Sequence, residues 1–215
     1  MDEIRILCYG DSNTWGYISG SDHKRYGNKE RWTKLLAELL GDEFEIIEEG
    51  LNSRTLISND TRPGKEGKNG YKYLIPCLDT HDPIDLVILM LGTNELKSVY
   101  NKTAEQIGNM LEEYFVKTIL NRKSQIGNNY PKLLLVTPPV VNENTEYCKQ
   151  KDKYLGAMQK SKELNLIYKN IAKKYDCYFL GNEELTTGVD GVHLTKESHK
   201  KLAEMLNIKI REIYK

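Results

Sequence analysis

The sequence predicts an α/β protein: a single three-layer α/β/α domain built on a doubly wound parallel sheet of about five strands. Short, continuously apolar runs alternate along the chain with longer segments whose apolar residues recur at helical spacing. Apolar runs without polar alternation are typical of strands that are covered on both faces, as in parallel sheets. No repeat, low-complexity stretch or linker divides the 215 residues, so we expect residues 1–215 to form one domain.

Five apolar runs are the expected strands, and turn-forming or polar residues follow each of them. In chain order they are residues 4–9 (IRILCY), 44–48 (FEIIE), 85–91 (DLVILML), 132–137 (KLLLVT) and a weaker run at 177–180 (CYFL).

The segments between these runs have the spacing of helices that pack one apolar face. We expect a last helix after Thr195, because Thr195 begins the sequence TKES and offers a capping side chain. The Gly- and Lys-rich stretch at 61–70 is expected to be a surface loop. The other expected helices cover residues 31–40 (ending at Gly41), 71–81, about 103–126 and about 154–175.

Composition excludes several kinds of partner. Basic and acidic side chains balance at 31 each, so no net field would draw the chain to nucleic acid or to anionic lipid. The N-terminal residues MDEIRILCYG lack a basic region before their short apolar run, and no stretch approaches the roughly 18 apolar residues of a membrane span. We therefore expect a cytoplasmic protein with reduced thiols and no membrane insertion, because its four cysteines are scattered singly: Cys8, Cys77, Cys148 and Cys177.

Ligands of a parallel α/β sheet bind beyond the carboxyl ends of its strands, so the residues that follow each strand are the candidates for chemistry. Ser12 follows the first run, near the start of a helix, where free N–H groups favour negative charge. Asp190 and His193 share the last loop, three residues apart. The alternative for Ser12 is an ordinary turn residue, but a hydroxyl, an imidazole and a carboxylate at one sheet edge are the set that acyl transfer needs.

Two further loops offer hydrogen-bond donors for an oxyanion. Asn94 carries a side-chain amide at the end of the third run, and the turn around 50–53 can offer a backbone N–H. The amide of Ser12 would be another donor.

Four blocks of this sequence together resemble those of the SGNH (GDSL) hydrolases. They are GDSNT near the N-terminus, a Gly/Asn/Ser turn after the second run, GTNE after the third and DGVHLT near the C-terminus. Longer stretches, such as PIDLVILMLGTNELK, look like the arylesterase and acyltransferase branch. The resemblance implies the flavodoxin-like fold of that family, with Ser12 as nucleophile, His193 as general base and Asp190 as its orienting acid.

The resemblance also implies an oxyanion hole made by the amide of Ser12, an amide in the second block and the side chain of Asn94. The family typically has glycine at the second-block donor, whereas this sequence has Ser53 there, with Gly50 as the alternative. A backbone N–H survives the change of side chain, but a position with φ > 0 would be less favourable for serine than for glycine.

We therefore predict a serine esterase that forms an acyl-enzyme on Ser12 and hydrolyses small short-chain esters, such as aryl or alkyl acetates, with acyl transfer to a competing alcohol as a second outcome. Alternatives within the family are a carbohydrate O-deacetylase and a lysophospholipase, and the alternative from another class is a non-catalytic binding module. The resemblance also implies a homo-oligomer.

The remaining candidates are substrate contacts. Trp15 and Asn13, next to Ser12, are candidate substrate-binding residues. His23, His81 and His199 are expected at the surface, since we find no carboxylate or cysteine at ligand spacing from them. With no metal-ligand cluster, phosphate loop or dinucleotide motif in the sequence, we expect no cofactor.

Overall fold

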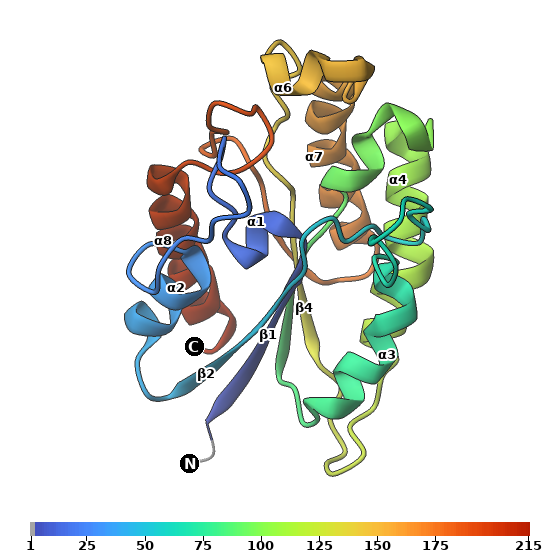
Figure 1. Cartoon of the computed structure of the whole chain (residues 1–215). Helices are drawn as coiled ribbons and strands as arrows, with labels where there is room; N and C mark the ends of the chain where they lie inside the picture. The colour runs from blue at the N-terminus through green and yellow to red at the C-terminus, as the bar shows by residue number, and fades with distance from the viewer. Residues whose placement is uncertain (1–2) are drawn as a thin grey trace.

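The computed structural model describes residues 3–215, and its centre is a five-stranded parallel sheet with helices on both faces (Figure 1). The strand order is β2-β1-β3-β4-β5, so β1 and β3 lie in the middle. All five expected strands are confirmed, with bounds β1 Ile4–Gly10, β2 Phe44–Gly50, β3 Leu86–Met90, β4 Lys132–Val136 and β5 Tyr178–Leu180.

Helices cover both faces of the sheet. On one face lie α2 and α8, and on the other α3, α4 and α7, while the short α1 sits at the carboxyl ends of the strands (Figure 1). The helices are α1 Ser12–Trp15, α2 Trp32–Leu40, α3 Gly70–Thr80, α4 Ala104–Met110, α5 Lys117–Leu120, α6 Glu146–Lys149, α7 Ala157–Lys174 and α8 Lys196–Ile213. Short 3₁₀ turns lie at Thr93–Leu96, Ser98–Tyr100 and Gln150–Asp152.

Each strand contributes to two cores, which explains why its sequence does not alternate. In β1, Ile6 and Cys8 pack with the residues of α2 and α8, whereas Leu7 and Tyr9 pack with those of α3, α4 and α7. Because both sets of side chains are fully buried, every position of the strand centre has to be apolar.

The helix expected over 103–126 differs most from the structure. It consists of α4, a π-helical segment at Leu111–Val116 and α5, and it ends at Leu120. The Asn121 side chain donates to the carbonyl of Lys117, and the polar residues that follow, rich in Gly and Asn, form a loop. The helix expected from 154 begins at Ala157, after Gly156 in a left-handed conformation (φ 72°). The capping residue expected for the last helix is confirmed, because Thr195 Oγ1 accepts from the N–H of Ser198.

In residues 3–215 no helix is both long enough and apolar enough to cross a membrane. All four cysteines are unpaired, and only Cys177 is not buried.

Candidate active site

Ser12 lies where β1 turns directly into α1. Asp11 caps that helix, because its Oδ1 accepts from the N–H of Asn13 at 2.9 Å, and this hydrogen bond stabilises the turn. The turn requires glycine at position 10: a Cβ there would lie 2.0 Å from Thr14 Oγ1 and 2.6 Å from the carbonyl oxygen of Met90. The tight turn leaves Ser12 as the first helical residue at the carboxyl edge of the sheet.

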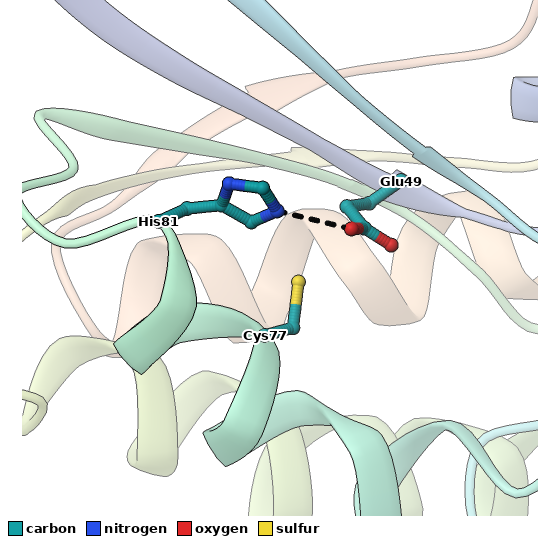
Figure 2. Close-up of side chains that lie close together, drawn as sticks. All are labelled: Glu49, Cys77 and His81. Atoms are coloured by element: carbon teal, nitrogen blue, oxygen red, sulfur yellow. Dashed lines mark hydrogen bonds and ion pairs between the residues drawn. The ribbon is translucent and has the colours of Figure 1, made fainter.

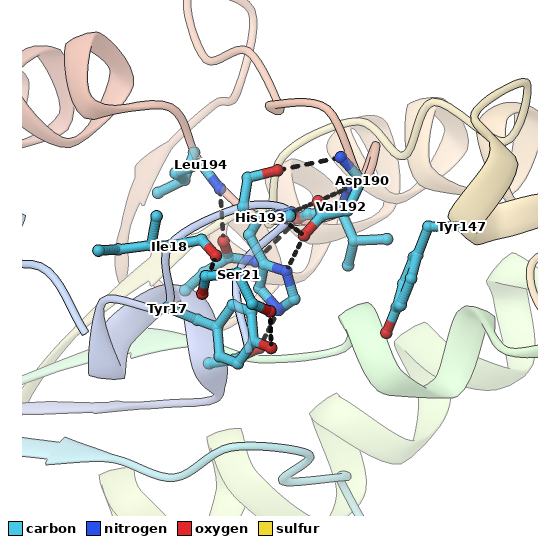
Figure 3. Close-up of polar contacts among 12 residues, drawn as sticks. Tyr17, Ile18, Ser21, Tyr147, Asp190, Val192, His193 and Leu194 are labelled. Atoms are coloured by element: carbon cyan, nitrogen blue, oxygen red, sulfur yellow. Dashed lines mark hydrogen bonds and ion pairs between the residues drawn. The ribbon is translucent and has the colours of Figure 1, made fainter. Parts of the chain in front are cut away.

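The structure brings Ser12, His193 and Asp190 together in one hydrogen-bonded chain. His193 Nε2 lies 2.9 Å from Ser12 Oγ, and His193 Nδ1 lies 2.6 Å from Asp190 Oδ2. An ionised carboxylate only accepts, so Nδ1 carries the proton and Nε2 is free to accept from the serine hydroxyl. Figure 3 shows the Asp190–His193 part of this chain within the C-terminal loop.

Asp190 stays ionised because its own loop supplies donors. Burial by itself would raise the pKa of Asp190, but the hydrogen bond and charge of His193, with the N–H groups of His193 and Val192, hold it well below its usual value. Both of those N–H groups donate to Oδ1 at 2.9 Å, and the N–H of Gly20 donates to Oδ2 at 3.2 Å. The carboxylate therefore fixes the orientation of the imidazole ring.

Asn13 and Trp15, the candidate substrate-binding residues, follow Ser12 in α1 and make contacts within the protein. Asn13 joins the Ser12 turn to the His193 loop: its Oδ1 accepts from the N–H of Leu194 at 2.9 Å, and its Nδ2 donates to the carbonyl of Val192 at 3.3 Å. Trp15 packs beside Tyr17. Asn13 thus holds the nucleophile and the base at a fixed separation.

The second-block turn has the conformation that family glycines would favour. Ser53 has φ +65°, and the N–H of Arg54 closes the turn on the carbonyl of Leu51 at 3.0 Å. In the described part of the chain, the N–H groups of Ser12 and Ser53 donate to no protein acceptor. Glycine at position 50 is required for a steric reason, because a Cβ there would lie 2.2 Å from the backbone nitrogen of Trp15.

Asn94 is oriented by a lysine that sequence reasoning missed. Lys97 Nζ donates to Asn94 Oδ1 at 2.6 Å, and Asn94 Nδ2 donates to the carbonyl of Arg54 at 2.9 Å. Because an ammonium only donates, it fixes the amide with its oxygen toward Lys97 and its NH₂ toward the second-block turn. The sequence contains a signal for this contact, because Asn94 and Lys97 are three residues apart and residues at that spacing lie on the same side of a 3₁₀ turn.

A cavity of about 260 Å³ adjoins the triad. Tyr17 stacks on His193 with ring centroids 4.3 Å apart and planes at 28°. Its hydroxyl donates to the carbonyl of Ser21, which holds the ring in place (Figure 3). The residues that line the cavity are Tyr17, Gly20, Ser21, Tyr147, Val189, Asp190 and His193.

The surface position expected for His199 is wrong. His199 is fully buried, and its Nδ1 accepts from the N–H of Trp32 at 3.2 Å. Burial lowers the pKa of His199 to about 3, so the ring is neutral at pH 7. Within the run KESHKK of α8, Ser198 and His199 face inward, whereas Lys196, Glu197 and Lys200 are exposed.

His81 is half-buried just after α3, and the expectation that no cysteine or carboxylate lies at ligand spacing from it is wrong, because Cys77 lies four residues before it. Figure 2 shows the two side chains with Glu49 from β2, and the three ligand atoms lie within 4.8 Å of one another. Zinc takes these ligand types, so the cluster could hold a metal ion. However, Glu49 already accepts from His81 at 3.1 Å and lies 3.7 Å from Arg54, which is 2% exposed and needs this negative charge. The cluster is therefore satisfied as an ion pair with hydrogen bonds.

Comparisons with known proteins agree with this architecture. A family model described as GDSL-like lipase/acylhydrolase matches residues 6–206. The structure is similar to Est24, a carbohydrate acetylesterase from Sinorhizobium meliloti (36% identity, 98% of this chain and 100% of that chain, TM-score 0.90). It is also similar to the native aryl esterase of M. smegmatis (36% identity, 97% and 99% covered, TM-score 0.87). No curated protein matches the sequence.

Proposed function

We propose, on the premise that this chain belongs to the GDSL-like lipase/acylhydrolase family, that Ser12 is the nucleophile of its ester hydrolysis. The chain is a carboxylic ester hydrolase with the SGNH fold. The observation that supports the assignment of Ser12 is the hydrogen-bonded chain from its hydroxyl through His193 to Asp190.

The proposed reaction runs through an acyl-enzyme. Ser12 Oγ attacks the ester carbonyl carbon while its proton passes to His193 Nε2, and the tetrahedral intermediate then collapses by breaking the bond to the alcohol oxygen. The imidazolium gives its proton to the departing alcohol. Water attacks the acyl-enzyme with His193 again as base, which releases the carboxylic acid and restores Ser12. Asp190 stabilises the imidazolium in both steps.

Three donors would stabilise the oxyanion: the N–H groups of Ser12 and Ser53 and the side-chain NH₂ of Asn94. The proposal is supported by the two unused N–H groups and by Lys97, which turns the Asn94 amide so that its NH₂ points toward the second-block turn. Gly50 stays the alternative donor, although its position in the β1–β2 ladder opposite Gly10 favours Ser53.

The proposed substrates are short-chain esters, such as aryl and alkyl acetates. A cavity of about 260 Å³ beside the triad suits a small acyl group and is below the roughly 300–1,000 Å³ of most ligand pockets, which disfavours the lysophospholipase alternative. Carbohydrate O-deacetylation is the second candidate, favoured by the similarity to Est24. Acyl transfer follows when another alcohol replaces water.

Assembly and compartment stay predictions. A homo-oligomer rests on the family resemblance, and a cytoplasmic location rests on the four unpaired cysteines.

A panel of 4-nitrophenyl esters from acetate to octanoate tests the proposal, with Ser12→Ala as the matched variant. We expect kcat/KM to be highest for the acetate and to fall with chain length. Ser12→Ala removes one oxygen and should fold normally, yet lower kcat by several orders of magnitude. If the folded variant kept more than about a tenth of the wild-type kcat, Ser12 would not be the nucleophile.

A further inference from the structure

A second and larger cavity, about 750 Å³, gathers three basic side chains. Its walls come from the loop 59–62, from residues 97–100 after the GTNE block and from the segment around α6. Arg62, Lys97 and Lys153 line it, with Asp60 as the one carboxylate among its lining residues. We name it the basic groove.

The basic groove touches the proposed active site at two points. Lys97 lines the groove and donates to Asn94, one of the proposed oxyanion donors, at 2.6 Å. Lys153 lines the groove and donates to the hydroxyl of Tyr147, which lines the cavity beside the triad. A molecule that occupies both cavities would therefore have its reacting ester close to these cations.

The charges of the groove are not balanced by its own residues. Asp60 accepts from Nε of Arg62 at 2.8 Å and from its Nη2 at 2.5 Å, and this pairing lowers the pKa of Asp60 to about 2. The pair leaves Nη1 of Arg62 available for another acceptor. Burial, together with the charges of Lys153 and Arg62, lowers the pKa of Lys97 to about 8, although the carboxylates of Asp60 and Glu95 act in the opposite direction. Three cations with one carboxylate form a site where an added anion would be stabilised.

We propose that the basic groove binds a carboxylate or phosphate group of the ester substrate, so that this enzyme prefers anionic esters over neutral ones of similar shape. The inference rests on the proposed function of Ser12. Arg62 and Lys153 supply charge-assisted hydrogen bonds to the anion. Val99, 81% exposed at the groove, offers an apolar contact for the part of the substrate that joins the anion to the ester.

Matched ester pairs test the proposal on both sides of the scissile bond. Phenyl acetate is compared with 4-acetoxybenzoate and 4-acetoxyphenyl phosphate, which place a carboxylate or a phosphate on the alcohol. The pair 4-nitrophenyl butyrate and 4-nitrophenyl hemisuccinate places the carboxylate on the acyl group. The carboxylate and phosphate arms show which anion the groove accepts. Ratios of kcat/KM between variant and wild type cancel the intrinsic reactivity of each ester.

Arg62→Gln should lower kcat/KM for at least one anionic ester by about five- to tenfold and change its neutral partner by less than about twofold. Lys153→Gln also removes the donor to Tyr147, so it is judged by the ratio of anionic to neutral kcat/KM, which should fall. Arg62→Lys should keep part of the preference. The control is Lys149→Gln, because Lys149 is an exposed lysine at the end of α6 that does not line the groove; this variant should change kcat/KM for neither ester. Raising the salt concentration should weaken turnover of the anionic ester only, because the field of the exposed Arg62 is screened.

Two results would overturn the inference: an equal loss for neutral and anionic esters, or no change of their ratio in either variant. In both cases, turnover of neutral esters that depends on Ser12 would leave the proposed function standing. If wild-type enzyme hydrolysed neither member of any pair, the proposed function itself would fail.

Discussion

Replacing His199 by Asn should make the protein less sensitive to acid. His199 is a buried neutral imidazole whose Nδ1 accepts from the N–H of Trp32, and its Nε2 has no partner in the described part of the chain. The charged and titratable groups that face it are His193, which lowers its pKa, Glu30, which raises it, and the ring of Tyr26 at 4.9 Å. Asn can keep the acceptor for Trp32 and does not titrate.

The size of the effect follows from the two pKa values. The pKa of His199 is about 3 in the folded protein, against 6.5 for an unperturbed histidine. Between these values the unfolded chain binds one proton more, so the free energy of unfolding falls as the pH falls, by about 1.4 kcal/mol per pH unit well inside this window. From pH 7 to pH 5 this group alone should remove about 2 kcal/mol.

Urea unfolding of both proteins at pH 7 and pH 5 measures this contribution, because all other titrating groups cancel in the comparison. The wild type should lose about 2 kcal/mol more than His199→Asn between the two pH values. Equal losses of unfolding free energy in the two proteins would refute the reasoning. They would mean that His199 is protonated in the folded state or is accessible to water.

The remaining predictions concern the proposed site. Asn94→Ala should lower kcat about 10²–10³-fold with little change in KM, measured on 4-nitrophenyl acetate; a nearly silent variant would remove Asn94 from the oxyanion hole. Ser53→Ala should cost less than about tenfold in kcat because it keeps the backbone N–H, and Ser53→Gly should keep activity with an unchanged or higher Tm, since φ is +65° there. Asp190→Asn should lower kcat by about 10⁴ at pH 7 with a normal melt, and a loss under tenfold would count against its role. Gly10→Ala should lower Tm strongly or prevent folding, because its Cβ would lie 2.6 Å from the carbonyl oxygen of Met90; a wild-type melt would contradict this contact.

The sheet could be predicted because strands that are buried on both faces have continuously apolar sequences. Every expected strand is present, and the differences lie in the helix that ends at Leu120 and in the late start of α7 at Ala157. Those bounds depend on local interactions that end or delay the helix, namely the hydrogen bond of the Asn121 side chain to the backbone and the left-handed conformation of Gly156. Helical spacing of apolar residues does not contain that information.

The candidate triad could be predicted because its members follow strands, and parallel strands end at one edge. The residues around it could not. Tyr17 and Tyr147 come together only through the folding of loops distant in sequence, and both line the cavity beside the triad. His199 looks like part of a charged helix face, and its inward position is set by the packing of α8 on α2.

Labelling with a fluorophosphonate tests the central claim most directly, because the reagent forms a stable bond only with an activated serine. The account predicts one adduct, mapped by mass spectrometry to Ser12, absent in folded Ser12→Ala and strongly slowed in His193→Gln. An adduct on another residue, or equal labelling of wild type and Ser12→Ala, would contradict it.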